Sequence, residues 1–305
     1  LLAGMAVTDR DRRALACGLG AVLLWSTVAT AFKLALRELD VWQLLAYASA
    51  FSAASLLVLL WWRGGLHLLR TYALESPAWF LLLGLFNPVL YYLLLLRAYQ
   101  LLPAQQAQAI NYTWAIALAL LAVPILGHRL GWRDLAAVCL GYAGVVIIAT
   151  QGRLVSLQVS SVEGVACALA STLVWALYWL ASVRNERDPV ASLCLTFLAA
   201  LPVTLACCAL FSSLALPGWR AVAGAAWVGV FEMGVTFALW STALRLASGV
   251  SRVGNLIFLS PLLSLVFIAT ILGEPIHPAT PVGLALVIGG LLLQQGPPSP
   301  EAAHG

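Results

Sequence analysis

Long apolar stretches, separated by short polar connections, occupy almost the whole chain. A helix needs about 20 consecutive apolar residues to cross the hydrocarbon core of a bilayer. The pattern predicts ten transmembrane helices, joined by connections that contain glycine, proline or charged residues. The predicted spans are roughly 14–36, 42–62, 77–98, 104–126, 132–150, 162–183, 190–213, 219–246, 250–272 and 279–295. The proline-rich end, residues 297–305, is predicted to be a disordered tail.

Composition agrees with this pattern. Hydrophobic residues make up 62% of the chain and charged residues 9%, whereas a soluble domain contains about 25% charged residues. We therefore expect an all-α integral membrane protein in contact with the lipid bilayer. The net charge of +4 is modest, and no basic cluster resembles a nucleic-acid-binding surface. Because the sequence has no phosphate-binding glycine loop and no metal-ligand spacing, we expect no nucleic-acid partner, no metal and no cofactor.

The basic residues are distributed unequally between the two sets of connections. Cytoplasmic loops of membrane proteins carry an excess of lysine and arginine. The richer side holds Arg10, Arg12, Arg13, Arg63, Arg70, Arg129, Arg133, Arg184, Arg187, Arg245 and Arg252, and the poorer side holds Lys33, Arg37, Arg97, Arg153 and Arg220. The distribution predicts a cytoplasmic N-terminus, and ten spans return the C-terminus to the same side.

One apolar segment occurs twice. Residues 250–274 contain Pro261 near the middle and end in Leu-Gly-Glu, and residues 104–128 repeat this pattern in degraded form, ending in Leu-Gly-His. A further match aligns residues 84–87 with residues 229–232. Since the matches follow the same order in both halves, the chain is predicted to be two copies of one unit.

Each copy contains five predicted spans. Because five is an odd number, the second copy enters the membrane from the opposite side, which makes an inverted-topology repeat. We expect the first repeat to cover residues 14–150 and the second to cover residues 162–296. Transporters built in this way bind substrate near the membrane midplane, between the two repeats.

The two halves resemble the drug/metabolite transporter superfamily of the EamA type. Each half has five helices, with a fourth helix that carries an aromatic-x-x-Pro-like pattern and ends in Leu-Gly-Glu or a relative. The first half departs from the pattern, because His128 replaces the glutamate and Ala115 replaces the proline. The resemblance covers residues 14–296 and looks closest to the bacterial aromatic amino acid exporters of the YddG-like group. It implies a bacterial inner-membrane protein with a central cavity lined by helices one, three, four, six, eight and nine.

Polar residues inside the spans are informative because the chain has so few charges. Glu232 is the only acidic residue deep in a span, and Asn87 occupies the equivalent position in the first half. Tyr91 follows Asn87 by four residues, as Thr236 follows Glu232, so each pair is expected to share a helix face. Two such polar faces would suit a site between the halves. Alternatively, Glu232 and Asn87 are structural residues that form hydrogen bonds between packed helices.

Several aromatic residues also fall well inside the spans rather than at the membrane interfaces, where they are usually enriched. Trp175, Tyr178 and Trp179 share one helix face, and Trp25 is the repeat equivalent of Trp175. Such rings can line a cavity for a flat apolar ligand. They can equally pack in the core or face lipid.

Spans four and nine carry a related pairing of polar and aromatic residues. Asn111 shares a face with Trp114, and Asn255 shares a face with Phe258. From these positions and the family resemblance, we expect a transporter that exports amino acids, with aromatic and other apolar ones preferred, by alternating access. The predicted substrate-binding residues are Trp25, Asn87, Tyr91, Asn111, Trp114, Trp175, Tyr178, Glu232, Asn255 and Phe258.

Two other functions are considered. An exporter of hydrophobic cations would use Glu232 as the counter-charge and the aromatic rings as cation–π partners. A membrane enzyme or receptor would need a converging nucleophile and base, or a sizeable domain outside the membrane. The sequence indicates neither feature, so we do not expect an enzyme.

Overall fold

The computed structural model describes residues 9–126, 131–153, 159–183, 187–215, 218–247 and 254–294. Every regular element within these ranges is a helix. Eight helical segments of the described chain are long and apolar enough to span a membrane, and two further apolar helices, Leu256–Leu272 and Ala279–Leu293, are shorter. The all-helical class is therefore confirmed for the described residues, while the number of ten spans stays a prediction.

The elements follow the predicted spans closely. In the first half they are α1 (Asp9–Ser26), α2 (Val28–Ala35), α3 (Val41–Trp62), α4 (Leu66–Glu75), α5 (Pro77–Gly84), η1 (Leu85–Leu90), α6 (Tyr91–Leu101), α7 (Ala104–Asn111), α8 (Trp114–Leu126) and α9 (Trp132–Ala149). In the second half they are α10 (Val162–Val183), α11 (Pro189–Phe211), α12 (Trp219–Trp227), η2 (Val228–Val235), α13 (Thr236–Leu246), η3 (Asn255–Phe258), α15 (Leu259–Phe267), η4 (Ile268–Leu272) and α16 (Ala279–Gln294).

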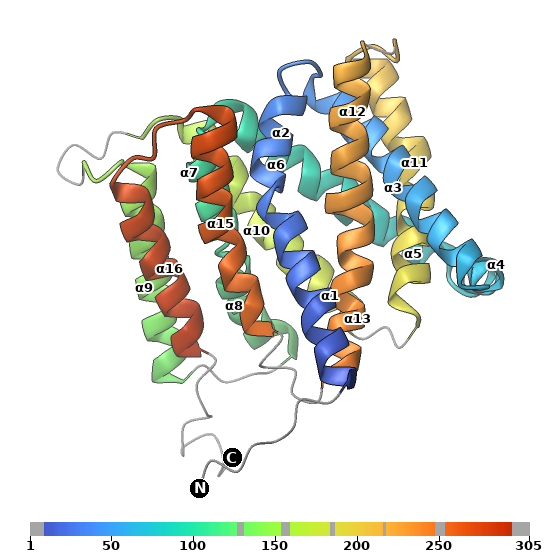
Figure 1. Cartoon of the computed structure of the whole chain (residues 1–305), viewed down its shortest axis with the longest axis horizontal. Coiled ribbons are helices and arrows are strands. Elements are labelled where there is room, and N and C mark those ends of the chain that lie inside the picture. The colour runs from blue at the N-terminus through green and yellow to red at the C-terminus, as the bar shows by residue number, and fades with distance from the viewer. Residues whose placement is uncertain are drawn as a thin grey trace, which may run out of the picture.

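Helix α4 is absent from the sequence-based prediction, which expected only a short connection there. It lies at the edge of the bundle and runs at a large angle to the long helices (Figure 1). None of its side chains is fully buried. Its ten residues are too few to cross a bilayer, so α4 is not one of the spans.

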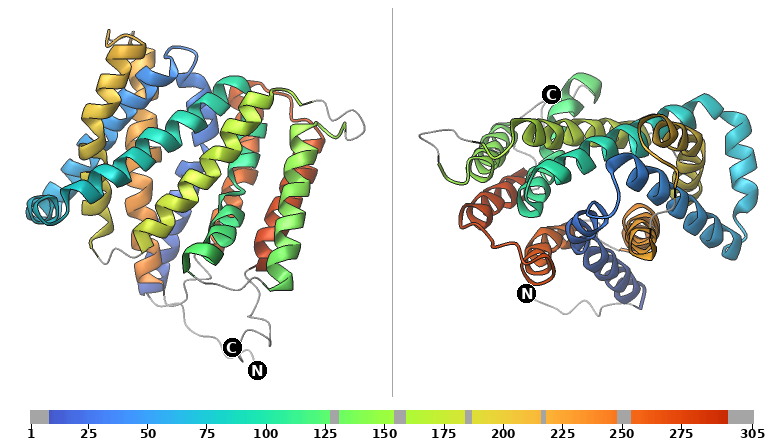
Figure 2. Two further views of the ribbon diagram at one scale, coloured as in Figure 1. Left: turned by 180° about the vertical axis from the view of Figure 1, so that it is seen from behind. Right: turned by 90° about the horizontal axis from the view of Figure 1, so that it is seen from above.

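The two halves interlock. The most extensive contacts each join a helix of the first half to one of the second: α9 with α16, α3 with α11, α1 with α13, and α6 with α10. The pair α9 and α16 lies at one edge of the bundle, and α3, α11 and α12 lie at the other (Figure 1). Figure 2 shows the same arrangement from behind and from above. Groups from both halves are therefore brought together between these edges.

Small residues allow α9 and α16 to pack closely. A Cβ atom on Gly283 would lie 2.6 Å from the Gly144 carbonyl oxygen, and one on Gly290 would lie 2.8 Å from the Ala137 carbonyl oxygen. Backbones can approach this closely in a membrane only where side chains are missing or small. The contact thus fixes the register of the two helices.

The segments η1 and η2 interrupt matching helices in the two halves, as the alignment of 84–87 with 229–232 predicts. The interruption η1 is a kink at Asn87, whereas η2 is a widened turn. The hydroxyl of Thr236, the first residue of α13, donates to the Phe231 carbonyl in η2, five residues earlier. The Ser52 hydroxyl of α3 donates to the Met233 carbonyl at 3.0 Å. Since a bilayer offers no water to freed backbone carbonyls, these hydroxyls stabilise the widened turns that carry Glu232.

The repeated turn at the end of span nine joins the two halves. Gly273 has a left-handed backbone with φ of 68°, which glycine adopts without steric penalty. The Glu274 carboxylate then accepts from the backbone N–H of Ala104, the first residue of α7, at 3.0 and 3.3 Å. The Gln105 side chain donates to the Pro275 carbonyl at 2.9 Å. The repeat equivalent, His128, lies outside the described residues.

Candidate functional site

A central cavity of about 420 Å³ lies between the two halves. Its lining comes from α1, α2, α6, α7, α8, α10, η2, α13 and η3, together with Leu291 of α16. These elements form predicted spans one, three, four, six, eight and nine, and Leu291 is an addition from span ten. The volume is within the range of about 300–1,000 Å³ that is typical of small-molecule sites.

Trp175 of α10 lies at the centre of an aromatic wall. It is buried, with 7% of its surface exposed. Its ring stacks on Tyr91 of α6 at 4.5 Å and on Tyr178 at 5.4 Å between centroids. Trp179 and Phe237 meet it edge-on at 6.1 and 5.8 Å. Because each of these rings constrains the next, the wall has a defined shape.

Further rings extend this wall around the cavity. Trp25 at the end of α1 meets Phe237 edge-on and Trp240 at a tilt, each at 5.5 Å between centroids. Trp114 at the start of α8 stacks on Trp179 at 6.4 Å. Flat rings in these orientations suit offset stacking with an aromatic ligand.

Glu232 in η2 is the only acidic or basic residue among the described lining residues. Its side chain is mostly buried, with 9% exposed. The Tyr92 hydroxyl donates to Oε1 at 3.3 Å, whereas Oε2 has no hydrogen-bond partner among the described residues. An unpaired buried carboxylate oxygen carries a desolvation penalty, which a donor group that reached it would relieve.

A second set of polar groups comes from the first half. Asn111, at the end of α7, accepts from the Tyr91 hydroxyl at 3.4 Å. Its amide donates to the Ser171 hydroxyl of α10 at 3.1 Å. The break between α7 and α8 lies directly after it, where the Thr113 hydroxyl donates back to the Ile110 carbonyl at 2.8 Å. The amide is thus held by two neighbouring helices at the edge of the cavity.

Both halves of the chain match one family model. The EamA-like transporter family matches residues 12–150 and again residues 162–294. The chain belongs to this family. The predicted superfamily and the two-repeat organisation of the EamA type are therefore confirmed, and the chain is a member of a transporter family rather than of an enzyme family.

Two curated proteins and one solved structure are similar to this EamA chain over most of their length. It is 28% identical over 282 residues to the aromatic amino acid exporter YddG of Ancylobacter novellus, and the alignment covers 90% of this chain and 93% of that protein. It is 26% identical over 284 residues to an uncharacterized transporter of Archaeoglobus fulgidus, and this alignment covers 89% of this chain and 93% of that protein. A solved crystal structure matches with a TM-score of 0.67 at 25% identity, covering 92% of this chain and 96% of the other.

The predicted site residues of this EamA chain have four outcomes, of which the last, that of Asn87, is described in the next paragraph. Seven of the ten line the central cavity: Trp25, Tyr91, Asn111, Trp114, Trp175, Glu232 and Phe258. Tyr178 instead lines a second cavity beside it. The side chain of Asn255 lies outside the described part of the structure. Their role in binding stays a prediction.

Asn87 differs from the sequence-based expectation. The side chain is 1% exposed and is not among the described residues that line the central cavity. Its backbone angles, φ −142° and ψ 113°, are not helical, as expected for a residue that precedes a proline. The four-residue spacing to Tyr91 therefore does not place the two side chains on one face, and the expected symmetry of two polar faces is not observed.

Several lining residues were not among the predicted ones. Trp179, Trp240, Phe237 and Tyr112 all line the cavity. Trp179 and Trp240 could have been predicted, because both lie inside spans like the residues that were chosen. Tyr112 lies at the break between α7 and α8, and no sequence signal indicates which way its ring turns there.

Proposed function

We propose that this transporter exports amino acids, with aromatic and other apolar ones preferred, from the cytoplasm across a bacterial inner membrane. The observation that carries the proposal is the combination of aromatic walls with two unpaired polar atoms of opposite kind. Besides Glu232 Oε2, the indole N–H of Trp179 is buried and has no hydrogen-bond partner among the described residues. Both residues line the central cavity.

An amino acid has the chemistry that complements these atoms. Its ammonium group can donate to Glu232 Oε2, and its carboxylate can accept from Trp179 Nε1. A hydrogen bond to a charged group contributes about 1.5–3 kcal/mol. The side chain would then lie among Trp25, Trp114 and Trp175, where stacking and burial favour flat apolar groups.

We further propose alternating access about the two repeats, with the N- and C-termini in the cytoplasm. Support comes from η1 and η2, which interrupt equivalent helices in the two halves, and from the excess of basic residues on one side. The repeats would cover residues 14–150 and 162–296. Discontinuous helices at the substrate site are a recurring feature of transporters with inverted repeats.

Export of hydrophobic cations is the second candidate. The specific observation in its favour is that Glu232, a carboxylate, is the only ionisable acid or base among the described residues of an aromatic cavity. Such a cavity can bind a lipophilic cation through its rings. The unpaired Trp179 N–H favours the amino acid, since a cation offers it no acceptor.

Counterflow into proteoliposomes tests both candidates. Purified protein is reconstituted with unlabelled phenylalanine inside, and uptake of labelled phenylalanine, tryptophan and threonine is measured with and without an imposed pH gradient. We expect saturable uptake without a gradient, with phenylalanine and tryptophan preferred over threonine. Absence of amino acid uptake, together with gradient-driven uptake of tetraphenylphosphonium, would favour the cation exporter.

A further inference from the structure

A second cavity, of about 290 Å³, lies next to the central one. It is bounded by α10, α11 and α13, with Leu56 of α3 and Leu83 of α5. Trp179, Phe237 and Trp240 line both cavities. Only one layer of aromatic side chains therefore separates the two spaces.

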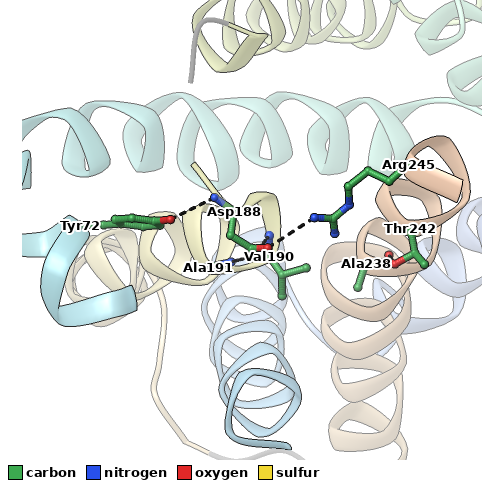
Figure 3. Close-up of polar contacts among 7 residues, drawn as sticks. All are labelled: Tyr72, Asp188, Val190, Ala191, Ala238, Thr242 and Arg245. Atoms are coloured by element: carbon green, nitrogen blue, oxygen red, sulfur yellow. Dashed lines mark hydrogen bonds and ion pairs between the residues drawn. The ribbon is translucent and has the colours of Figure 1, made fainter. Parts of the chain in front are cut away.

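Arg245 lines this second cavity, and the oppositely charged Asp188 faces it (Figure 3). Asp188 precedes α11 and is fixed in place: its Oδ1 accepts from the backbone N–H groups of Val190 and Ala191 at 3.0 and 2.9 Å. Its own backbone N–H donates to the Tyr72 hydroxyl at 3.2 Å. Asp188 Oδ2 is left to face Arg245, at the end of α13.

The ion pair between these two residues is loose. Arg245 Nη1 lies 3.5 Å from Asp188 Oδ2, which is longer than the 2.7–2.9 Å of a close charge-assisted hydrogen bond. The Arg245 side chain is 50% exposed and that of Asp188 is 30% exposed. Such an exposed pair contributes little to stability, about 0–1 kcal/mol. A second carboxylate can therefore bind Arg245 at little energetic cost.

Arg187, the other basic residue among the described residues that line this cavity, is held differently. It donates to Glu75 at 3.1 Å and to the Ser76 hydroxyl at 3.0 Å. Its guanidinium also lies over the Tyr72 and Phe80 rings, 5.3 and 5.5 Å from their centroids. Because these contacts fix Arg187 against α4 and α5, Arg245 is the basic group that the described lining residues offer to a ligand.

The rest of the second cavity is mainly apolar, with hydroxyl groups between the rings. Tyr178, Trp179 and Trp240 provide flat apolar surface. The hydroxyls of Ser182 and Thr196 donate to carbonyls of their own helices at 2.7 and 2.8 Å, which leaves oxygen lone pairs as acceptors. An apolar cavity with a loosely paired guanidinium at its rim suits a small carboxylate with an aromatic or aliphatic tail.

We propose that the second cavity is a loading site, where Arg245 exchanges Asp188 for the carboxylate of an aromatic or apolar solute before the solute passes the aromatic layer into the central cavity. Its location fits this role, because Arg10 at the start of α1 donates to the Arg245 carbonyl at 3.0 Å. The start of α1 lies beside the end of α13 (Figure 1), at the proposed cytoplasmic end. The role as a loading site rests on the proposed export of amino acids. The binding of a carboxylate at Arg245 does not.

Equilibrium binding separates the two cavities. The probes are tritiated phenylacetate, which has a carboxylate and no amine, and tritiated phenethylamine, which has an amine and no carboxylate. With purified full-length protein, we expect Arg245→Gln to weaken phenylacetate binding by about 10-fold, the loss of one partly exposed charge-assisted hydrogen bond. Phenethylamine binding should be unchanged in this variant and reduced in Glu232→Gln.

Asp188→Asn should change the affinity for phenylacetate in the opposite direction. Asparagine retains the cap on α11, because it is as good an N-cap residue as aspartate, but it removes the carboxylate that competes for Arg245. We expect phenylacetate to bind more tightly, by about 3-fold, to this variant. Arg220→Gln is the matched control, since Arg220 lies over Trp219 at the start of α12, at the opposite end of the bundle (Figure 1).

The outcomes distinguish this proposal from the proposed function. Wild-type phenylacetate affinity in Arg245→Gln, or an equal loss of both probes, overturns the carboxylate site. A loss of phenylacetate binding in Asp188→Asn also overturns it, because the pair would then be purely structural. If the site binds phenylacetate as expected and yet no amino acid shows counterflow, the proposed function fails and the carboxylate site stands.

Discussion

Replacing Glu232 by glutamine is the sharpest test of the central cavity. The amide has nearly the size of the carboxylate, and its carbonyl oxygen can still accept from the Tyr92 hydroxyl, which lies 3.3 Å from Oε1. What changes is Oε2, which has no partner among the described residues and becomes an uncharged NH₂ group. A hydrogen bond to a charged group contributes about 1.5–3 kcal/mol, so phenylalanine affinity should fall by about 10- to 100-fold while the protein stays folded.

The assay is counterflow of labelled phenylalanine, with the half-saturation concentration as the readout and the melting temperature in detergent as the folding check. Glu163→Gln is the matched control: it removes the same charge from a side chain that is exposed and pairs with Arg97 at 2.8 Å. The control should transport as the wild type does. Wild-type half-saturation in a folded Glu232→Gln variant would make Glu232 a structural residue and refute its role in holding the ammonium group.

Three further predictions follow from the packing. Trp175→Ala should lower the affinity for tryptophan and phenylalanine more than that for threonine in competition counterflow, because Trp175 supplies ring surface. An equal loss of affinity for all three would contradict the aromatic wall. Trp175→Phe serves as the milder variant if the alanine variant is unstable. Gly283→Ala should lower the free energy of unfolding by about 1–3 kcal/mol, which is measured as a lower melting temperature. Gly289→Ala, whose Cβ would meet only Leu140 at 3.6 Å, should leave the melting temperature nearly unchanged. Equal melting temperatures of the two variants would refute the close α9–α16 contact. Glu274→Ala removes the acceptor for the Ala104 N–H and should destabilise the protein by about 0.5–2 kcal/mol in thermal melting, an effect that Glu163→Ala should not produce.

The features that the sequence predicts well are those that depend on the average hydrophobicity of a long segment or on the order of several matches. A span of apolar residues is recognisable whatever its neighbours are, so the limits of α3 and α10 agree with the prediction within one residue. The repeat is recognisable because the matches at 84–87 and 229–232 keep their order, and these positions carry η1 and η2. Seven of the predicted site residues line one cavity, because interior aromatic and polar residues have few other places to go in a bilayer.

Features that depend on local departures from ideal geometry could not be predicted in the same way. Helix α4 is too short and too polar to register in a search for spans. Tyr178 shares a helix face with Trp175 and yet lines the second cavity, because the aromatic layer that divides the two cavities is made by side chains from several helices. Such a division arises only from tertiary packing.

The two halves differ at the site itself, and the difference has a physical reason. Pro88 disfavours helical geometry at Asn87, whose backbone angles are not helical. The Asn87 side chain is buried and is not among the described residues that line the central cavity. In the other half no proline follows Glu232, and Glu232 is among the residues that line the cavity. A pair of repeats with identical site chemistry would offer two equivalent polar groups to a substrate. This pair offers one acid from the second half, beside a surface of aromatic and amide groups to which both halves contribute. Such an asymmetric site matches the proposed substrate, which has one ammonium group and one apolar side chain.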